Sequence, residues 1–173
     1  MEETDAQRRL LIRSLAVLPL LLSACDDSGV RKSQGGLLPT GTLDRLDGGQ
    51  VELGVSSGPC LINFWATWCQ PCRAEMASLN RLFNDFRPKG LGVFAISVDE
   101  DIHLVREFLL QLPLSFPILL DPGGKRATKD YGILGYPTTF LVARNAVVKE
   151  IWVGERNWDA SEVRVACDAL IQT

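Results

Sequence analysis

Residues 60–66, CLINFWA, form a run that is apolar at almost every position. A strand with one face in water alternates apolar and polar residues, whereas a strand covered on both faces does not. We therefore expect a central strand here, in a sheet that is covered on both sides. The 173 residues and the 46% apolar content are enough for one domain with a core of this kind.

After about residue 40 the chain alternates short apolar runs with segments of helical period. Strands are predicted at residues 50–53, 60–66, 91–98, 138–143 and 147–153, and at the run FPILL. Helices are predicted over residues 70–87, from Ile102 to a stop at Pro113, around KRATKDY, and over residues 163–171. Helix-linked strands favour parallel pairing, whereas the tight turn after residue 143 requires antiparallel neighbours. The predicted fold class is α/β, with a mixed sheet and helices on both faces.

Two cysteines, Cys69 and Cys72, stand between the central strand and the next predicted helix. A structural zinc site takes about four Cys or His ligands. The sequence has one such closely spaced pair and a single histidine, His103, which we interpret as a solvent-facing residue of the second helix. A disulfide closed over two residues would also remove little entropy from the unfolded chain. We therefore expect no metal, no cofactor and no purely structural bridge at this pair.

The position of the pair favours redox chemistry. The first turn of a helix offers unpaired N–H groups and the positive end of the helix dipole, and both stabilise a thiolate. We therefore expect a lowered pKa at Cys69, which would be the nucleophile. Pro71 costs no hydrogen bond in a first turn. Cys72, one turn further on, would face inward and resolve the mixed disulfide.

The segment FWATWCQPCRAEM resembles the active-site segment of thioredoxin-fold proteins, and in particular of their exported TlpA/ResA-like branch. Weaker matches occur in the family's order, so that the likeness covers most of residues 40–173; they are LDGGQVEL, ISVDE, DPGGK and YGILGYPTTFLV. The resemblance implies a thioredoxin-like domain with an N-terminal strand extension. It also implies a thiol-disulfide oxidoreductase that works outside the cytoplasm, often as a reductant in cytochrome c maturation.

The same resemblance implies roles for residues around the pair. Pro137 matches the cis proline that faces the cysteines, and Tyr136 would offer its backbone to an extended substrate. Trp68 would shield the thiolate and contact substrate. The alternatives are an ordinary loop aromatic for Tyr136 and packing over the strand ends for Trp68. Glu75, three residues after Cys72, matches a glutamate of the branch and is expected to take the Cys72 proton; a solvated carboxylate is the alternative.

The chain departs from the family at several positions. Asn63 stands where cytoplasmic thioredoxins carry a buried aspartate, and Ala77 stands where a proline is common. Cys60 and Cys167 are additional cysteines, which we expect to be buried and inert. An exported protein could instead join them in a structural disulfide, which needs Cα atoms within about 7 Å.

The first 24 residues have the features of an export signal, with the basic end QRRLLIR and the apolar stretch SLAVLPLLL. The sequence LSAC, which ends at Cys25, resembles the lipobox of bacterial lipoproteins. We expect a signal peptide over residues 1–24, a lipidated Cys25, and a flexible tether over residues 25–39. Cleavage near Ala24 without lipidation is the alternative, and the export route, general or twin-arginine, stays open. The domain would then lie on the extracytoplasmic (periplasmic) side of the cytoplasmic membrane.

The predicted function is a membrane-tethered thiol-disulfide oxidoreductase that reduces disulfides of exported proteins, for example apocytochrome c. Its partners would be those proteins and an upstream membrane dithiol donor, and the protein itself would be a monomer. A dithiol oxidase is an alternative, because the residues between the cysteines do not reveal the reduction potential. A thiol peroxidase is another, although Ala66 lacks the hydroxyl that such enzymes carry three residues before their cysteine. A net charge of −3 without a basic run argues against nucleic acid.

Overall fold

The computed structural model describes residues 34–54 and 58–173. Its sheet has seven strands in the order β2-β1-β5-β4-β3-β6-β7. The strands are β1 (Gly41–Arg45), β2 (Gln50–Leu53), β3 (Cys60–Trp65), β4 (Gly92–Ser97), β5 (Ile118–Leu120), β6 (Thr138–Val142) and β7 (Val148–Val153). Strands β3, β4 and β5 are parallel, whereas β6 and β7 continue the sheet antiparallel on one side and β1 and β2 on the other. The predicted mixed α/β sheet is therefore confirmed.

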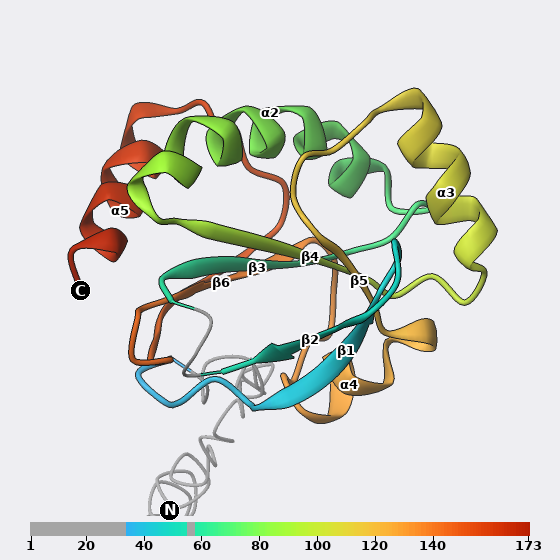
Figure 1. Ribbon diagram of the computed structural model, residues 1–173, viewed down its shortest axis with the longest axis horizontal. Coiled ribbons are helices and arrows are strands. Elements are labelled where there is room, and N and C mark those ends of the chain that lie inside the picture. Colours follow the sequence, from blue (N-terminus) through green and yellow to red (C-terminus); the bar gives the residue numbers. More distant parts are fainter. Residues whose placement is uncertain (1–33, 55–57) are drawn as a thin grey trace, which may run out of the picture.

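Helices cover both faces of this sheet. They are α2 (Gln70–Phe86), α3 (Ile102–Gln111), α4 (Lys125–Lys129) and α5 (Ser161–Ile171), with short 3-10 turns η2 (Arg87–Lys89) and η3 (Pro122–Gly124). Helices α2, α3 and α5 lie on one face, and α4 lies on the other (Figure 1). This arrangement follows from right-handed crossovers between the parallel strands.

Strand β3 is the centre of the core, as its apolar run predicts. All six of its residues are buried. Successive side chains point to opposite faces: the ring of Phe64 packs against Tyr131, 4.9 Å between centroids, and the ring of Trp65 packs against Phe108 of α3, 5.2 Å away. Both helical layers are therefore anchored on one strand, and that strand ends four residues before Cys69.

The N-terminal strand extension is a hairpin of β1 and β2, with β1 inserted beside β5. Its turn contains Gly48 and Gly49 at φ values of 98° and 79°, which favour glycine because it has no Cβ. The guanidinium of Arg126 in α4 donates to the carbonyls of Thr40 and Thr42. This contact joins the hairpin to the helix on the same side of the sheet.

Residues 34–39, the end of the predicted tether, lie against the sheet. Leu37 forms a β-bridge with Val147, Leu38 is buried, and the N–H of Gly35 donates to the carbonyl of Val148. The packed part of the chain therefore includes residues before the predicted boundary at residue 40. The predicted signal peptide and Cys25 lie outside the described residues. Within residues 34–54 and 58–173, no helix combines the length and apolar character needed to cross a membrane.

Candidate active site at the start of helix α2

The two motif cysteines lie at the first turn of α2. Cys69 is the N-cap, with Pro71 in the first turn, and its sulfur accepts a hydrogen bond from the backbone N–H of Cys72 at 3.3 Å. Cys69 and Cys72 form a disulfide. Cys69 is 7% exposed and Cys72 is 0% exposed, so Cys69 is the member of the pair that solvent can reach. This asymmetry agrees with the expected nucleophile and resolving cysteine.

A buried carboxylate holds the loop that leads to Cys69. Asp99 follows the end of β4 and accepts hydrogen bonds from the backbone N–H and the hydroxyl of Thr67, the latter at 2.6 Å. The hydroxyl of Ser97 donates to the same carboxylate at 2.7 Å. Our sequence analysis did not assign a role to Asp99. A signal was present, because a carboxylate directly after a buried parallel strand lies at the edge where the motif loop also emerges.

Glu75 lies on the inner side of α2 and is 2% exposed, so the alternative of a solvated carboxylate is wrong. The amide of Asn63 in β3 donates to its Oε1 at 2.8 Å, and the backbone N–H of Arg156 donates to its Oε2 at 2.9 Å. Burial raises the pKa of Glu75 to about 7, against the lowering effect of these two hydrogen bonds. A carboxyl group with this pKa can both take and give a proton near neutral pH.

Asn63 fixes the other side of Glu75. Its side-chain amide also donates to the hydroxyl of Thr139 in β6, at 2.9 Å. The three residues thus form a buried polar chain from α2 through β3 to β6. Because an amide does not titrate, Glu75 is the ionisable member of this chain.

Trp68 directly precedes Cys69 in sequence, and its ring contacts that of Tyr136. The Tyr136–Pro137 peptide bond is cis, as the family resemblance implies. The rings of Trp68 and Tyr136 are 5.9 Å apart in an edge-on arrangement, and Trp68 is 66% exposed. Both rings line a cavity of about 430 Å³ that also contacts Val98, Asp99, Glu100, Asp101, Leu104 and Gly123. The exposed ring of Trp68 is therefore available to a ligand rather than packed away.

The two additional cysteines are not part of the motif pair. Cys60 and Cys167 are buried free thiols, so the structural disulfide between them is not formed. Burial raises the pKa of each to about 12. His103 is exposed on α3, as expected. In the part of the chain that the structure describes, no group of three His, Cys, Asp or Glu side chains is arranged to hold a metal ion.

Comparisons with known proteins agree with this geometry. Residues 35–151 match the model of the AhpC/TSA family. The thiol-disulfide oxidoreductase ResA of Bacillus thuringiensis subsp. konkukian is 34% identical over 125 residues, which cover 72% of each chain. ResA of Geobacillus thermodenitrificans is 32% identical over 157 residues, 86% of this chain and 89% of its own.

A solved structure is similar over its whole length. The crystal structure of a candidate thiol:disulfide interchange protein DsbE from Chlorobium tepidum matches with a TM-score of 0.73 and 31% identity. The match covers 80% of this chain and 97% of that one. The fold, the Cys69–Cys72 disulfide and these relatives lead to one conclusion: the chain belongs to the AhpC/TSA family, as a thiol-disulfide oxidoreductase of the ResA/DsbE type.

Proposed function

We propose that this oxidoreductase works as a dithiol reductant of exported proteins, held at the outer side of the cytoplasmic membrane by a lipid on Cys25. The observation that carries the proposal is the contrast within the pair: Cys69 keeps some exposure to solvent, whereas Cys72 is fully buried and lies one helical turn from buried Glu75. In such a site the substrate disulfide reacts with Cys69, and the proton of the Cys72 thiol can pass to Glu75 inside the protein.

The reaction has two exchange steps. The Cys69 thiolate attacks one sulfur of the substrate disulfide, so that a mixed disulfide forms and the other substrate sulfur leaves as a thiolate. Glu75 then takes the proton of the Cys72 thiol, and the Cys72 thiolate attacks the sulfur of Cys69. The substrate leaves reduced by two electrons, and the enzyme holds the Cys69–Cys72 disulfide. An upstream membrane dithiol donor would return both cysteines to the thiol state.

Trp68 and Tyr136 are proposed to bind the substrate. Both residues line the same cavity, and Tyr136 lies in the loop before β6, where its backbone would be offered to an extended substrate chain. Glu100 and Asp101 also line the cavity and are exposed. The substrate would therefore meet both aromatic and acidic side chains at this cavity.

The direction of electron flow is the finer part of this proposal. The family resemblance favours reduction, with the cysteine pair of apocytochrome c as the first candidate substrate. A dithiol oxidase is the alternative. A thiol peroxidase has less support, because Ala66 has no hydroxyl and the nearby hydroxyl of Thr67 donates to Asp99 instead.

Trapping tests the proposal directly. In a Cys72→Ser variant the mixed disulfide cannot be resolved, so the physiological substrate should stay attached to Cys69 and be identifiable by mass spectrometry. A Cys167→Ser variant is the matched control and should trap nothing. Side-by-side assays of protein disulfide reduction and peroxide consumption complete the test. Turnover of peroxide without turnover of disulfide would overturn the proposed reaction.

A further inference from the structure

The loop of residues 154–160, which joins β7 to α5, lies over Glu75. Its residues Glu155, Asn157 and Asp159 are exposed, yet the backbone N–H of Arg156 donates directly to the buried Glu75 carboxylate. One layer of loop therefore separates Glu75 from solvent on this side. The 154–160 loop is the cover of the proposed proton-transfer group.

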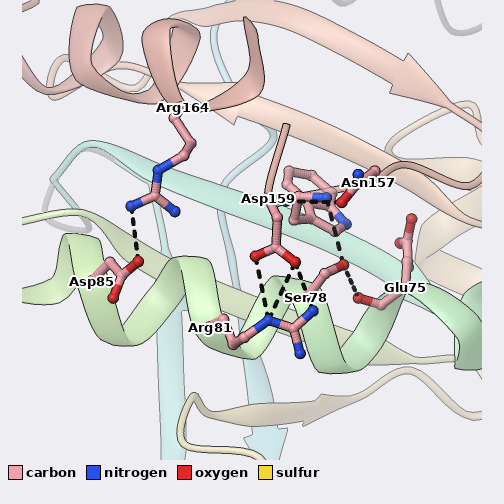
Figure 2. A network of polar contacts seen from close by, with 8 residues as sticks. Glu75, Ser78, Arg81, Asp85, Asn157, Asp159 and Arg164 are labelled. Atoms are coloured by element: carbon pink, nitrogen blue, oxygen red, sulfur yellow. Dashed lines mark hydrogen bonds and ion pairs between the residues drawn. The ribbon is translucent and has the colours of Figure 1, made fainter. Parts of the chain in front are cut away.

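Three side chains of α2 face this loop. Glu75, Ser78 and Arg81 follow each other at three-residue spacing and so share one stripe of the helix. The hydroxyl of Ser78 donates to the carbonyl of Glu75 at 2.8 Å and accepts the backbone N–H of Trp158 at 3.4 Å. Figure 2 shows Ser78 between the helix and the loop.

Arg81 makes the strongest of these contacts. Its guanidinium donates from two nitrogens to Asp159, with the shortest distance, from Nη2 to Oδ2, at 2.6 Å (Figure 2). The N–H of Asp159 is bonded in turn to the side chain of Asn157, so the ion pair holds a stiff turn rather than a free side chain. Both partners are largely exposed, and an exposed ion pair contributes little to overall stability. Its effect is instead local.

We propose that Arg81, Ser78 and Asp159 are positioning residues, which fasten the 154–160 loop to α2 so that the loop keeps water away from the Glu75 carboxylate. The proposal rests on the acid–base role of Glu75 for its functional meaning, although the fastening itself does not. The neighbouring ion pair between Arg164 and Asp85 joins α5 to α2 one turn beyond, and neither of its residues belongs to the loop.

The groups around Glu75 determine how its pKa should change when the loop is released. On the loop, the charge of Glu155 raises the Glu75 pKa, whereas the backbone N–H of Arg156 and the side chain of Trp158 lower it; β3 contributes the amide of Asn63, which also donates to Thr139 in β6. Burial is the largest influence and raises the Glu75 pKa, whereas the Arg156 N–H lowers it. Releasing the loop removes both the burial and the Arg156 hydrogen bond. Because burial has the larger effect, the Glu75 pKa should fall.

The test uses two variants that change charge in opposite ways. Asp159→Ala removes a negative charge near Glu75, and Arg81→Gln removes a positive one. Simple Coulomb effects would move the Glu75 pKa in opposite directions, whereas release of the loop lowers it in both. We expect a fall of about one pH unit in each variant, because water then reaches the carboxylate. Ser78→Ala should act in the same direction.

Two readouts separate this inference from the function on which it rests. Glu75 is titrated by carboxyl ¹³C NMR in the full-length oxidised protein, and the pH dependence of disulfide reduction is measured in parallel. A fall in both Arg81→Gln and Asp159→Ala, with Asp85→Asn unchanged, supports the fastening role. If the NMR titration shifts and the rate profile does not, the fastening stands and Glu75 leaves the mechanism. An unshifted titration, or opposite shifts in the two variants, overturns the inference.

Discussion

Two regions of this protein contain pairs of cysteines and give them opposite properties. At the start of α2, Cys69 and Cys72 lie at a helix N-terminus and form a disulfide. On β3 and α5, Cys60 and Cys167 are buried free thiols whose pKa values burial raises to about 12. The residue type is the same, so the difference comes from backbone position and solvent. The following predictions test this comparison.

The largest effect is expected from exchanging one cysteine in each region. Cys69→Ser should reduce disulfide-reductase activity to the background of the assay, because no other sulfur at the site reaches solvent. Cys167→Ser should retain most of the activity, since that sulfur has no part in exchange. Equal losses in the two variants, with both proteins folded by circular dichroism, would remove the functional contrast between the regions.

Alkylation of the reduced protein compares the regions in one molecule. A thiol with a pKa of about 12 is thiolate to about one part in 100,000 at pH 7. Cys69 should therefore react with iodoacetamide at least about 1,000-fold faster than Cys60 or Cys167. Peptide mapping by mass spectrometry over time gives the three rates. Modification of Cys60 as fast as Cys69 in folded protein contradicts the environments described here.

Glu75→Gln removes the proposed proton acceptor but keeps the size of the side chain. We expect disulfide reduction at pH 7 to slow by about 100-fold, within the usual range for a general base. The rise of rate with pH that reports Glu75 ionisation, centred near its pKa of about 7, should disappear. Glu107→Gln, which changes an exposed carboxylate on α3, is the control. An unaltered pH–rate curve for Glu75→Gln excludes it from the reaction.

The same substitution should stabilise the fold at alkaline pH. The pKa of Glu75 rises from 4.5 to about 7 on folding, so the folded state binds the proton more tightly than the unfolded state. The protein should therefore lose stability as pH rises between these values, by about 3 kcal/mol at most. Urea unfolding at pH 5 and pH 8.5 should show this loss in the wild type and not in Glu75→Gln. A parallel loss in the variant would assign it to other groups.

The smallest effect concerns the surface around the reactive sulfur. Trp68→Ala removes an exposed ring from the rim of the cavity without opening the core. We expect catalytic efficiency toward a protein disulfide to fall several-fold, with little change toward a small disulfide that makes few contacts. An equal fall in catalytic efficiency toward both substrates would show that the ring affects the exchange reaction at the sulfur rather than substrate binding.

The sequence predicts the core of this fold well and its polar contacts poorly. The apolar run of β3 and the helical period of α2 are local patterns, and both elements form within one or two residues of their expected bounds. Periodicity does not predict strand β1, because a single one of its five residues, Leu43, is buried and this gives no alternating pattern. The cis bond before Pro137 comes from family resemblance, since local propensity favours trans.

Contacts around Glu75 lie beyond reach of such patterns. Asn63 and Thr139 are 76 residues apart in sequence, and the hydrogen bond between them depends on the register of β3 with β6. The 154–160 loop has no periodicity that would place it over the same carboxylate. The helix stripe alone indicates that Glu75 faces inward near Cys72, whereas the groups that set its pKa become visible in the assembled layers.

The β-bridge between Leu37 and Val147 bears on how the domain would be oriented at a membrane. It lies beside the β6–β7 turn, at the Cys60 end of β3, whereas Cys69 follows the Trp65 end. The six residues of β3 separate these poles by about 20 Å. If the protein is attached to a membrane through its amino end, the Leu37 end of the domain would face the bilayer. Cys69 would then lie on the side that faces away from the membrane.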